Sequence, residues 1–311
     1  WKWYKPPVLN KNQKKIMKKE TAISTVRNHL RESVIRQMTS DVPVGAFLSG
    51  GLDSSSIVTF AREKNKDISC FTIESKGGHE EGITDDLNYA KKVSKHLKVP
   101  LEVISIDSIK MASDIEFMIK TLDEPIADPA ALNVFYISKM AKEKGIKVLL
   151  SGAGGDDIFT GYRRHYALGL EKYWTWLPYK AKTFFKKISS QFNQHNLLNR
   201  RLSKLFSGAN LSSDERLINY FSWMQRDDLE SLYSLEFKSE IKNSNPMSEM
   251  LRFLKELPPN VSKLDKMLSL EQQFFLADHN LLYTDRMSMA TGVEVRVPFL
   301  DKKLIEFTKN I

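Results

Sequence analysis

The residues best suited to chemistry lie in a short glycine- and serine-rich stretch, Ser49-Gly50-Gly51-Leu52-Asp53-Ser54-Ser55. It follows an apolar run at 42–48 that predicts a buried strand, and it runs into a segment of helical composition at 54–64. Two glycines permit backbone angles closed to other residues, so successive N–H groups can converge on an anion. Serine hydroxyls add donors, and the following helix directs its positive end to the same place. The stretch therefore predicts a phosphate-binding loop.

Asp53 narrows the chemistry expected of this loop. A carboxylate repels phosphate, so its presence makes sense if a divalent cation bridges it to the phosphates. The stretch also lacks the lysine of the GxxxxGK[ST] loop, which serves the β- and γ-phosphates. A loop without that lysine suits holding pyrophosphate while chemistry occurs at the α-phosphorus. An unliganded strand-to-helix turn is the competing interpretation, and the complete motif behind a buried strand disfavours it.

Further acidic residues lie in two other loops. Asp156 belongs to the glycine-rich stretch 151–157, directly after an apolar run at 146–150. It is a candidate Mg²⁺ ligand or a helix N-cap, and the two roles can coexist. Asp123, Glu124 and Asp128 in LDEPIADP are candidate site residues or ordinary turn formers around two prolines. Histidines such as His279 are scattered, with no His/Cys cluster at metal-binding spacing, and are predicted to be surface or packing residues.

Alternating strands and helices must position these loops. Apolar runs predict strands at 42–48, 68–73, 101–106 and 146–150, and helical patterns surround them at 20–39, 54–64, 85–97, up to about 121, and 133–144. This alternation predicts an α/β fold, a doubly wound parallel sheet, over about 40–165. The first twenty residues indicate an entry linker, and about 166–311 is predicted to be a mainly helical part whose aromatic residues belong to the core.

The motifs also carry a family resemblance. SGGLDSS resembles the pyrophosphate loop of the N-type ATP pyrophosphatases, the PP-loop superfamily. The stretch 151–162, SGAGGDDIFTGY, looks like the second loop of asparagine synthetases, commonly SGxGxDExFxGY. DRMSMA at 285–290, running into GVEVRVPFLD at 292–301, closely resembles that family's segment. The chain thus resembles the synthetase domain of glutamine-hydrolysing asparagine synthetases, which implies a Rossmann-like, adenine nucleotide alpha hydrolase-like fold.

The resemblance assigns roles to individual residues. Backbone at Leu48 and Ile73 would hold adenine, and Ser151 and Gly152 would line the nucleotide and substrate pocket. The β- and γ-phosphates would be held by Ser49, Gly50, Gly51, Ser54 and Ser55. Mg²⁺ would be bound by Asp53 and Asp156. Candidates for the substrate pocket are Asp123, Glu124, Asp128, Asp285 and Arg286.

The implied reaction uses ATP and Mg²⁺ to convert a carboxylate, aspartate or a related acid, to an acyl-adenylate with release of pyrophosphate. Ammonia then gives the amide and AMP. Positioning and charge neutralisation would supply most of the catalysis. The nitrogen would come from ammonia or from glutamine through a glutaminase domain, and the resemblance also allows a homodimer.

Three departures from the family pattern limit what the resemblance implies. The second loop has Ala153 where bacterial asparagine synthetases have a glutamate associated with adenylate formation, so the acid is left open. The family's glutaminase domain, with its first-residue cysteine, is missing before Trp1, and its catalytic lysine would lie beyond Ile311. We therefore expect a fragment trimmed at both ends, and no catalytic residue is assigned.

Composition limits the possible classes of protein. The chain has 311 residues, 41% hydrophobic, and no apolar run near the roughly 20 residues of a membrane helix. The single cysteine, Cys70, excludes an internal disulfide and favours a cytoplasmic protein. The net charge of +9 keeps open a PP-loop enzyme that modifies tRNA, although no nucleic-acid-binding motif is present. An amidotransferase acting on a sugar acid or another carboxylate in surface-polysaccharide synthesis also stays open, as does a non-catalytic ATP-binding module.

Overall fold

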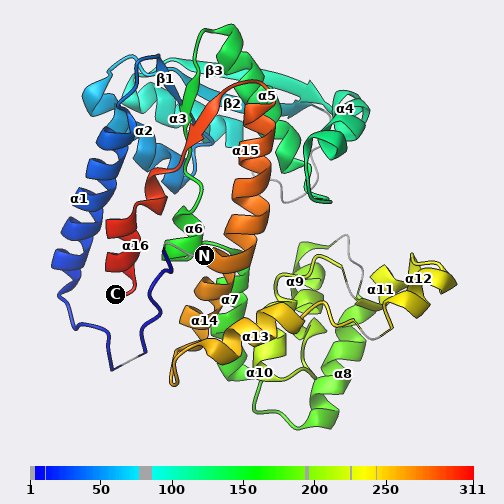
Figure 1. Cartoon of the computed structure of the whole chain (residues 1–311). Helices are drawn as coiled ribbons and strands as arrows, with labels where there is room; N and C mark the ends of the chain where they lie inside the picture. Colours follow the sequence, from blue (N-terminus) through cyan, green and yellow to red (C-terminus); the bar gives the residue numbers. More distant parts are fainter. Residues whose placement is uncertain (1–3, 11, 77–85, 193–195, 225, 243) are drawn as a thin grey trace. The chain divides into compact units, whose positions relative to one another are not determined.

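The computed structural model describes residues 4–10, 12–76, 86–192, 196–224, 226–242 and 244–311 (Figure 1). Part of the predicted entry linker, residues 1–3 and 11, and the first residue of the helix predicted at 85–97 lie outside them. The chain divides into two compact units. The first comprises Gln13–Thr160 and Glu271–Ile311 with a few residues from the start of the chain, and the second comprises Gly161–Leu270 with a short early segment.

A five-stranded parallel sheet forms the centre of the first unit, with strand order β3-β2-β1-β4-β5. The strands are β1 (Val44–Phe47), β2 (Cys70–Lys76), β3 (Leu101–Asp107), β4 (Val148–Leu150) and β5 (Glu294–Arg296). The first four coincide with the predicted strands. The fifth lies within the segment predicted to be mainly helical, and it extends the sheet by pairing with β4.

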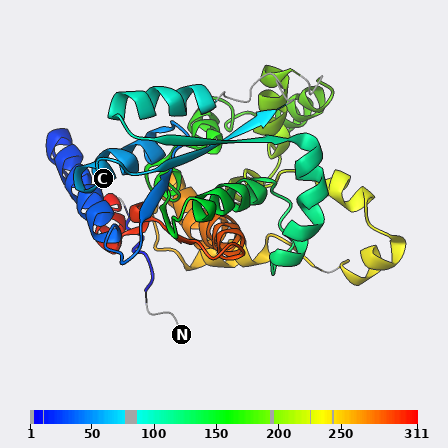
Figure 2. The ribbon, with the colours of Figure 1, turned by 90° about the horizontal axis from the view of Figure 1, so that it is seen from above.

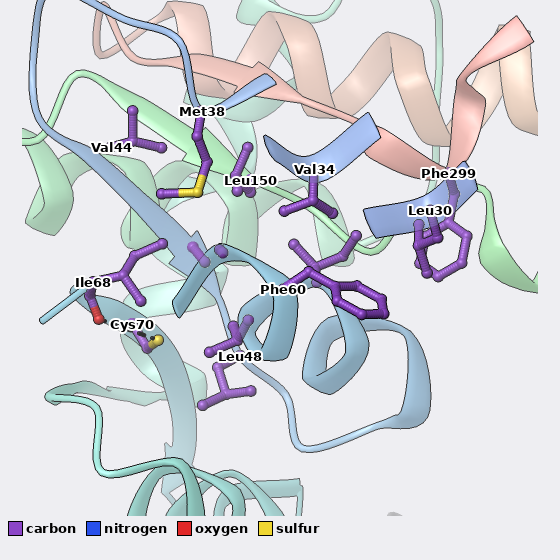
Figure 3. Packing of buried hydrophobic residues seen from close by; sticks show 14 of the residues in the cluster. Leu30, Val34, Met38, Val44, Leu48, Phe60, Ile68, Cys70, Leu150 and Phe299 are labelled. Carbon is purple, nitrogen blue, oxygen red and sulfur yellow. Dashed lines mark hydrogen bonds between the residues drawn. The ribbon is translucent and has the colours of Figure 1, made fainter. Parts of the chain in front are cut away.

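Alternate strand residues face opposite sides of this sheet, because side chains along a strand alternate in direction. Ala46, Cys70 and Leu150 belong to one buried cluster, which also contains Leu30 and Val34 (Figure 3). Helices α1 (Lys19–Gln37), α2 (Leu52–Lys64), α3 (Asp86–Leu97) and α16 (Lys302–Thr308) supply the rest of it. Leu30 and Val34 are one helical turn apart on α1, so both point into the cluster.

The other face carries a second buried cluster, to which Phe71 and Leu149 contribute from the strands. Helices α4 (Ser108–Thr121), α5 (Ala130–Glu143) and α15 (Leu282–Met289) cover this face. Figure 2 shows the sheet between α3 on one side and α5 and α15 on the other. Helices on both faces of a parallel sheet confirm the predicted α/β, doubly wound fold. No described helix is both long and apolar enough to cross a membrane.

Short elements complete the first unit, and helices make up the second. In the first, α6 (Gly155–Phe159) follows β4, a π-helical segment η2 (Glu271–Leu281) precedes α15, and η3 (Pro298–Leu300) precedes α16. The described part of the second unit contains α7 (Arg163–Leu170), η1 (Glu171–Tyr173), α8 (Tyr179–Ser190), α9 (Leu197–Ser207), α10 (Ser213–Asn219), α11 (Arg226–Ser231), α12 (Leu235–Glu240), α13 (Ser248–Glu256) and α14 (Lys263–Leu270), and no strand.

A buried carboxylate organises the second unit. The Glu171 carboxylate accepts from the Arg216 guanidinium at 2.6 Å and from Lys263 at 2.8 Å, and both Glu171 and Arg216 are buried. The Tyr220 hydroxyl donates to the same carboxylate at 3.2 Å, and the Arg216 guanidinium also lies over the Trp174 ring. Because a buried charge is tolerated only when it is paired, these contacts must form together as the unit folds.

Candidate active site

The two glycine-rich loops begin where neighbouring strands end. The first loop follows β1 and the second follows β4, and these strands pair directly, with Ala46 opposite Leu150. From β1 the chain crosses to β2 on one side, whereas β4 lies on the other side of β1. Ligands of open α/β sheets bind outside the carboxyl ends of strands at such a reversal of strand order. The fold therefore brings the two predicted loops to one position.

Gly50 holds the first loop close to α3. Its φ is +82°, and a Cβ added there would lie 2.4 Å from the backbone of both Tyr89 and Ala90. Only glycine combines that backbone angle with such a close approach. Gly51 differs, because it is the extended N-cap of α2 and an added Cβ would meet only Ser49 Oγ, at 3.4 Å. The first glycine shapes the loop, and the second leaves its outer side open.

Two glycines of the second loop lie against the first loop. A Cβ on Gly152 would lie 2.8 Å from the Ser54 nitrogen, and a Cβ on Gly155 would lie 2.2 Å from the Asp53 carboxylate. A larger residue at Gly152 would displace the backbone of the first loop, and a larger residue at Gly155 would displace the Asp53 carboxylate. The two loops can approach this closely only because Gly152 and Gly155 have no side chains, and the contact fixes the position of Asp53.

Hydroxyl groups close the first loop on itself. Ser49 Oγ lies 3.1 Å from Ser54 Oγ, and Ser54 Oγ donates to the Gly51 carbonyl at 3.3 Å. The Gly51 N–H donates to Ser49 Oγ at 3.3 Å. Ser55 Oγ is buried and has no hydrogen-bond partner among the described residues. A buried hydroxyl without a partner indicates a missing acceptor, and a phosphate oxygen would supply one.

Asp53 and Asp156 are brought together at the first turns of α2 and α6. Burial and, to a smaller extent, the charge of Asp156 together raise the pKa of Asp53 to about 6, against the opposing effect of a hydrogen bond from the Asp156 N–H. Asp156 is not the N-cap of α6, because Gly154 occupies that position. Two carboxylates that repel each other beside a phosphate-binding loop fit a divalent cation.

Two carboxylates are also the number of protein ligands that Mg²⁺ commonly takes in nucleotide enzymes. Among the residues that the structure describes, no group of three or more His, Cys, Asp or Glu is placed to hold a metal ion. Mg²⁺ in nucleotide enzymes is usually bound through one or two carboxylates, with water and the substrate phosphates completing its shell. Asp53 and Asp156 supply those carboxylates, so the residues present fit the ion.

Some backbone N–H groups near the predicted adenine position already donate hydrogen bonds to neighbouring strands. The Leu48 N–H donates to the Phe71 carbonyl at 2.9 Å, and the Ser151 N–H donates to the Arg296 carbonyl at 2.8 Å. Ile73 pairs with Ile104 in β3. The fold places Leu48 and Ser151 at the ends of paired strands, and Ile73 one strand farther from the second loop.

The predicted substrate residues form two separate contacts rather than one cluster. The Arg286 guanidinium makes an ion pair with Asp123. Asp128 uses one carboxylate oxygen to accept from the Ala130 N–H at 2.9 Å and places the other 3.4 Å from His279 Nε2. Asp128 therefore has the turn-forming role and a further contact as well. The remaining two predicted residues, Glu124 and Asp285, are exposed.

Comparison with known proteins decides the family. The sequence model of the asparagine synthase family matches residues 25–311. The chain belongs to the asparagine synthase family. This confirms the resemblance drawn from the three motifs.

The relatives of this family member are distant and longer. It is 28% identical over 293 residues to asparagine synthetase [glutamine-hydrolyzing] 1 of Bacillus subtilis, a match that covers 93% of this chain and 44% of that protein. It is 27% identical over 306 residues to a putative asparagine synthetase [glutamine-hydrolyzing] of Mycobacterium tuberculosis H37Rv, covering 98% and 44%. The chain thus spans less than half the length of these relatives. Among solved structures, NMN synthetase from Francisella tularensis is similar, with 10% identity, a TM-score of 0.34 and coverage of 83% and 95%.

The second loop of this family member has no acid or base at its centre. Ala153 follows Gly152, and its N–H donates to Ser151 Oγ at 3.1 Å. A methyl group can neither accept a proton nor stabilise positive charge. Position 153 therefore supplies no acid, base or charge to the second loop.

Sequence reasoning missed a cluster around the π-helical segment. His279, predicted to be a surface or packing residue, stacks on Phe275 at 4.9 Å between ring centroids and meets the edge of Tyr283 at 5.3 Å. Burial raises the pKa of Tyr283 to about 12, with contributions from the charges of Asp128 and Asp157. The cluster therefore connects the LDEPIADP loop with the helix that follows the second loop.

A π-helical segment is itself a signal of function, because such segments are rare and occur frequently at functional sites. Here it spans Glu271–Leu281 and carries His279. Its first turn contacts the second loop's helix, where Gln272 Nε2 donates to the Asp157 carbonyl at 2.9 Å. No sequence pattern indicates the π geometry, because the apolar residues of this stretch are equally compatible with an α-helix.

Proposed function

We propose that this chain is the synthetase part of an ATP-dependent amide-forming ligase, which activates a carboxylate as its acyl-adenylate and transfers ammonia to it. The observation that carries the proposal is the contact between the two loops, in which Gly152 and Gly155 leave room only for Asp53 and the loop backbone. The contact between the loops supports a site that binds pyrophosphate next to the carboxylates of Asp53 and Asp156. Membership of the asparagine synthase family supports the same reaction.

In the proposed mechanism the first loop binds and orients the triphosphate. The Gly50 N–H, the hydroxyl of Ser55 and the positive end of α2 would hold the β- and γ-phosphates. The Gly51 N–H would join them once phosphate replaces Ser49 Oγ as its acceptor. Asp53 and Asp156 would hold Mg²⁺, which neutralises phosphate charge and makes pyrophosphate a better leaving group. Leu48 and Ile73 would border the adenine. These contacts favour the reaction chiefly through positioning.

The chemistry proceeds in two steps. A carboxylate oxygen of the acid forms a bond to the α-phosphorus, and the bond from that phosphorus to the β-phosphate oxygen breaks, releasing pyrophosphate. The nitrogen of ammonia then forms a bond to the acyl carbon, AMP leaves with the acid's oxygen, and the nitrogen loses a proton. The ammonia would come from solution or from a glutaminase domain, since the relatives are named as glutamine-hydrolysing.

Ala153 favours a second candidate for the acid. Because the second loop has no glutamate, we propose two alternatives for the acid: aspartate, or a larger carboxylate such as a sugar acid. The His279–Asp128 contact and the ring of Tyr283 are candidates for the surface that selects among them.

The test is amide formation with the intact protein, MgATP, ammonium chloride and a panel of acids that includes aspartate, sugar acids and acidic peptides. The proposal expects one acid to give pyrophosphate and amide in equal amounts. Asp53→Asn should abolish both, whereas Asp67→Asn, at an exposed position beyond the C-terminal end of α2, serves as the matched control. Tight ATP binding with no pyrophosphate from any acid would instead indicate a nucleotide-binding module.

A further inference from the structure

A groove of about 840 Å³ in the second unit is lined by cationic side chains. Helices α7 and α9 supply most of its walls, and no acidic residue is among the residues that line it. Its volume is within the range of small-molecule sites, roughly 300 to 1,000 Å³. Its cationic lining consists of Arg163, Arg164, Arg200, Arg201 and Lys204, and its aromatic residues include Tyr166.

Helical spacing explains why one face of each helix is directed to the groove. On α7, Arg163, Tyr166 and Leu170 are three and four residues apart, so they lie along a single face. On α9, Arg201 and Lys204 follow the same spacing. The groove is therefore a property of two helix surfaces.

Two of the cations have structural roles. Lys204 donates through Nζ to the carbonyls of Asn219 and Ser222, at the end of α10, and burial lowers its pKa. The Arg164 guanidinium lies 3.9 Å from the ring centre of Tyr162 and 4.7 Å from that of Phe221. Both side chains are committed to neighbouring groups, so neither is the main source of uncompensated charge.

The other three cations are different. Arg163, Arg200 and Arg201 are exposed, and none of their guanidinium groups makes a hydrogen bond or ion pair with another described residue. Three guanidinium groups that share one groove repel one another, and the lining offers no carboxylate to offset them. An anion with more than one negative charge would remove this repulsion, whereas a single carboxylate would leave most of it.

We propose that this groove binds a sugar-linked diphosphate, that is, a small molecule in which two adjacent phosphate groups are attached to a sugar. The planar guanidinium group matches phosphate oxygens in a bidentate geometry, and arginine is favoured where phosphate is recognised. Tyr166, whose exposed fraction is 75%, offers a ring face for the sugar or an attached base. The cations of this site lie outside residues 49–55 and 151–162, and the proposal does not depend on the proposed ligase reaction.

The test is a calorimetric titration of the full chain with uridine 5′-diphosphate in the presence of EDTA. We expect saturable binding at one site per chain, with the same affinity in the Ser55→Ala variant, whose change lies in the first glycine-rich loop. The Arg200→Gln/Arg201→Gln double variant should bind roughly tenfold more weakly or worse, since two charge-assisted contacts are lost. The matched control is Lys186→Gln/Lys187→Gln, which removes the same charge from exposed positions on α8 and should bind as the wild type does.

Several results would overturn the inference. These are no saturable binding, weaker binding by the Ser55→Ala variant, or equal weakening in both double variants. Inorganic pyrophosphate binding as tightly as the nucleotide would show that the sugar plays no part. A single-stranded oligonucleotide that binds more tightly than the nucleotide, with a steep salt dependence and loss in the arginine variant, would identify a nucleic-acid surface instead.

Discussion

Three glycine-to-alanine substitutions, two in the first loop and one at Gly145 outside it, distinguish the cost of backbone strain from the cost of steric collision. Gly50 and Gly145 both have positive φ, +82° and +79°, but an added Cβ meets backbone at 2.4 Å in the first and nothing within 4 Å in the second. Gly51 has an ordinary backbone angle and open space. Alanine in the left-handed region costs about 1 kcal/mol, and overpacking against backbone adds about 1–3 kcal/mol. We therefore expect losses of about 2–4 kcal/mol for Gly50→Ala, about 1 for Gly145→Ala and close to zero for Gly51→Ala.

The assay is urea denaturation of the three variants without nucleotide or divalent cation, which reports the free energy of unfolding. The comparison with Gly145→Ala matters most, because in that variant the alanine has the unfavourable positive φ but its Cβ collides with no other atom. If Gly50→Ala were no less stable than Gly145→Ala, the close packing of the loop against α3 would be wrong. Gly51→Ala then provides a folded protein in which ATP binding can be measured by itself.

Three further predictions concern charge. Because the folded-state pKa of Asp53 is raised to about 6, its protonated form stabilises the fold below about pH 4, and this contribution is lost as pH rises through 6. Between pH 4 and 8 in EDTA, the free energy of unfolding of Asp53→Asn should therefore rise by about 1–2 kcal/mol relative to that of the wild type, after allowance for solvent screening. A difference between the two proteins that does not change with pH would contradict this. Glu171→Gln should cost about 3–5 kcal/mol by leaving Arg216 buried and unpaired, whereas Glu249→Gln, in an exposed pair, should cost less than about 1 kcal/mol; equal losses would refute the distinction. Ala153→Glu should raise the ratio of aspartate to other acids in amide formation, and an unchanged ratio would separate this position from substrate choice.

Much of the fold followed from local patterns. The strands at β1 to β4 are short apolar runs with turn residues at their ends, and each is readable without knowledge of its partner. β5 is different, since Glu294–Arg296 has one apolar residue, Val295, between two charged ones. Its place in the sheet depends on pairing with β4, which lies far away in the sequence. Pairing of this kind is not encoded locally.

The same distinction separates the predicted site residues from the missed ones. The first loop was identifiable because its glycines, serines and Asp53 are consecutive. His279 and Asp128 are distant in sequence, and each has an ordinary local context. They come into contact only because α15, which continues directly from η2, packs in the second buried cluster. Asp123 and Arg286 were both predicted, but their ion pair could not be.

The most direct test of the central claim is to follow ¹⁸O from the carboxylate of the acid during amide formation from MgATP and ammonia. If the carboxylate attacks the α-phosphorus, one labelled oxygen appears in AMP and the other product of ATP is pyrophosphate. Formation of ADP with label in inorganic phosphate would show attack at the γ-phosphorus, and it would contradict the account of the glycine-rich loops as a pyrophosphate-binding site.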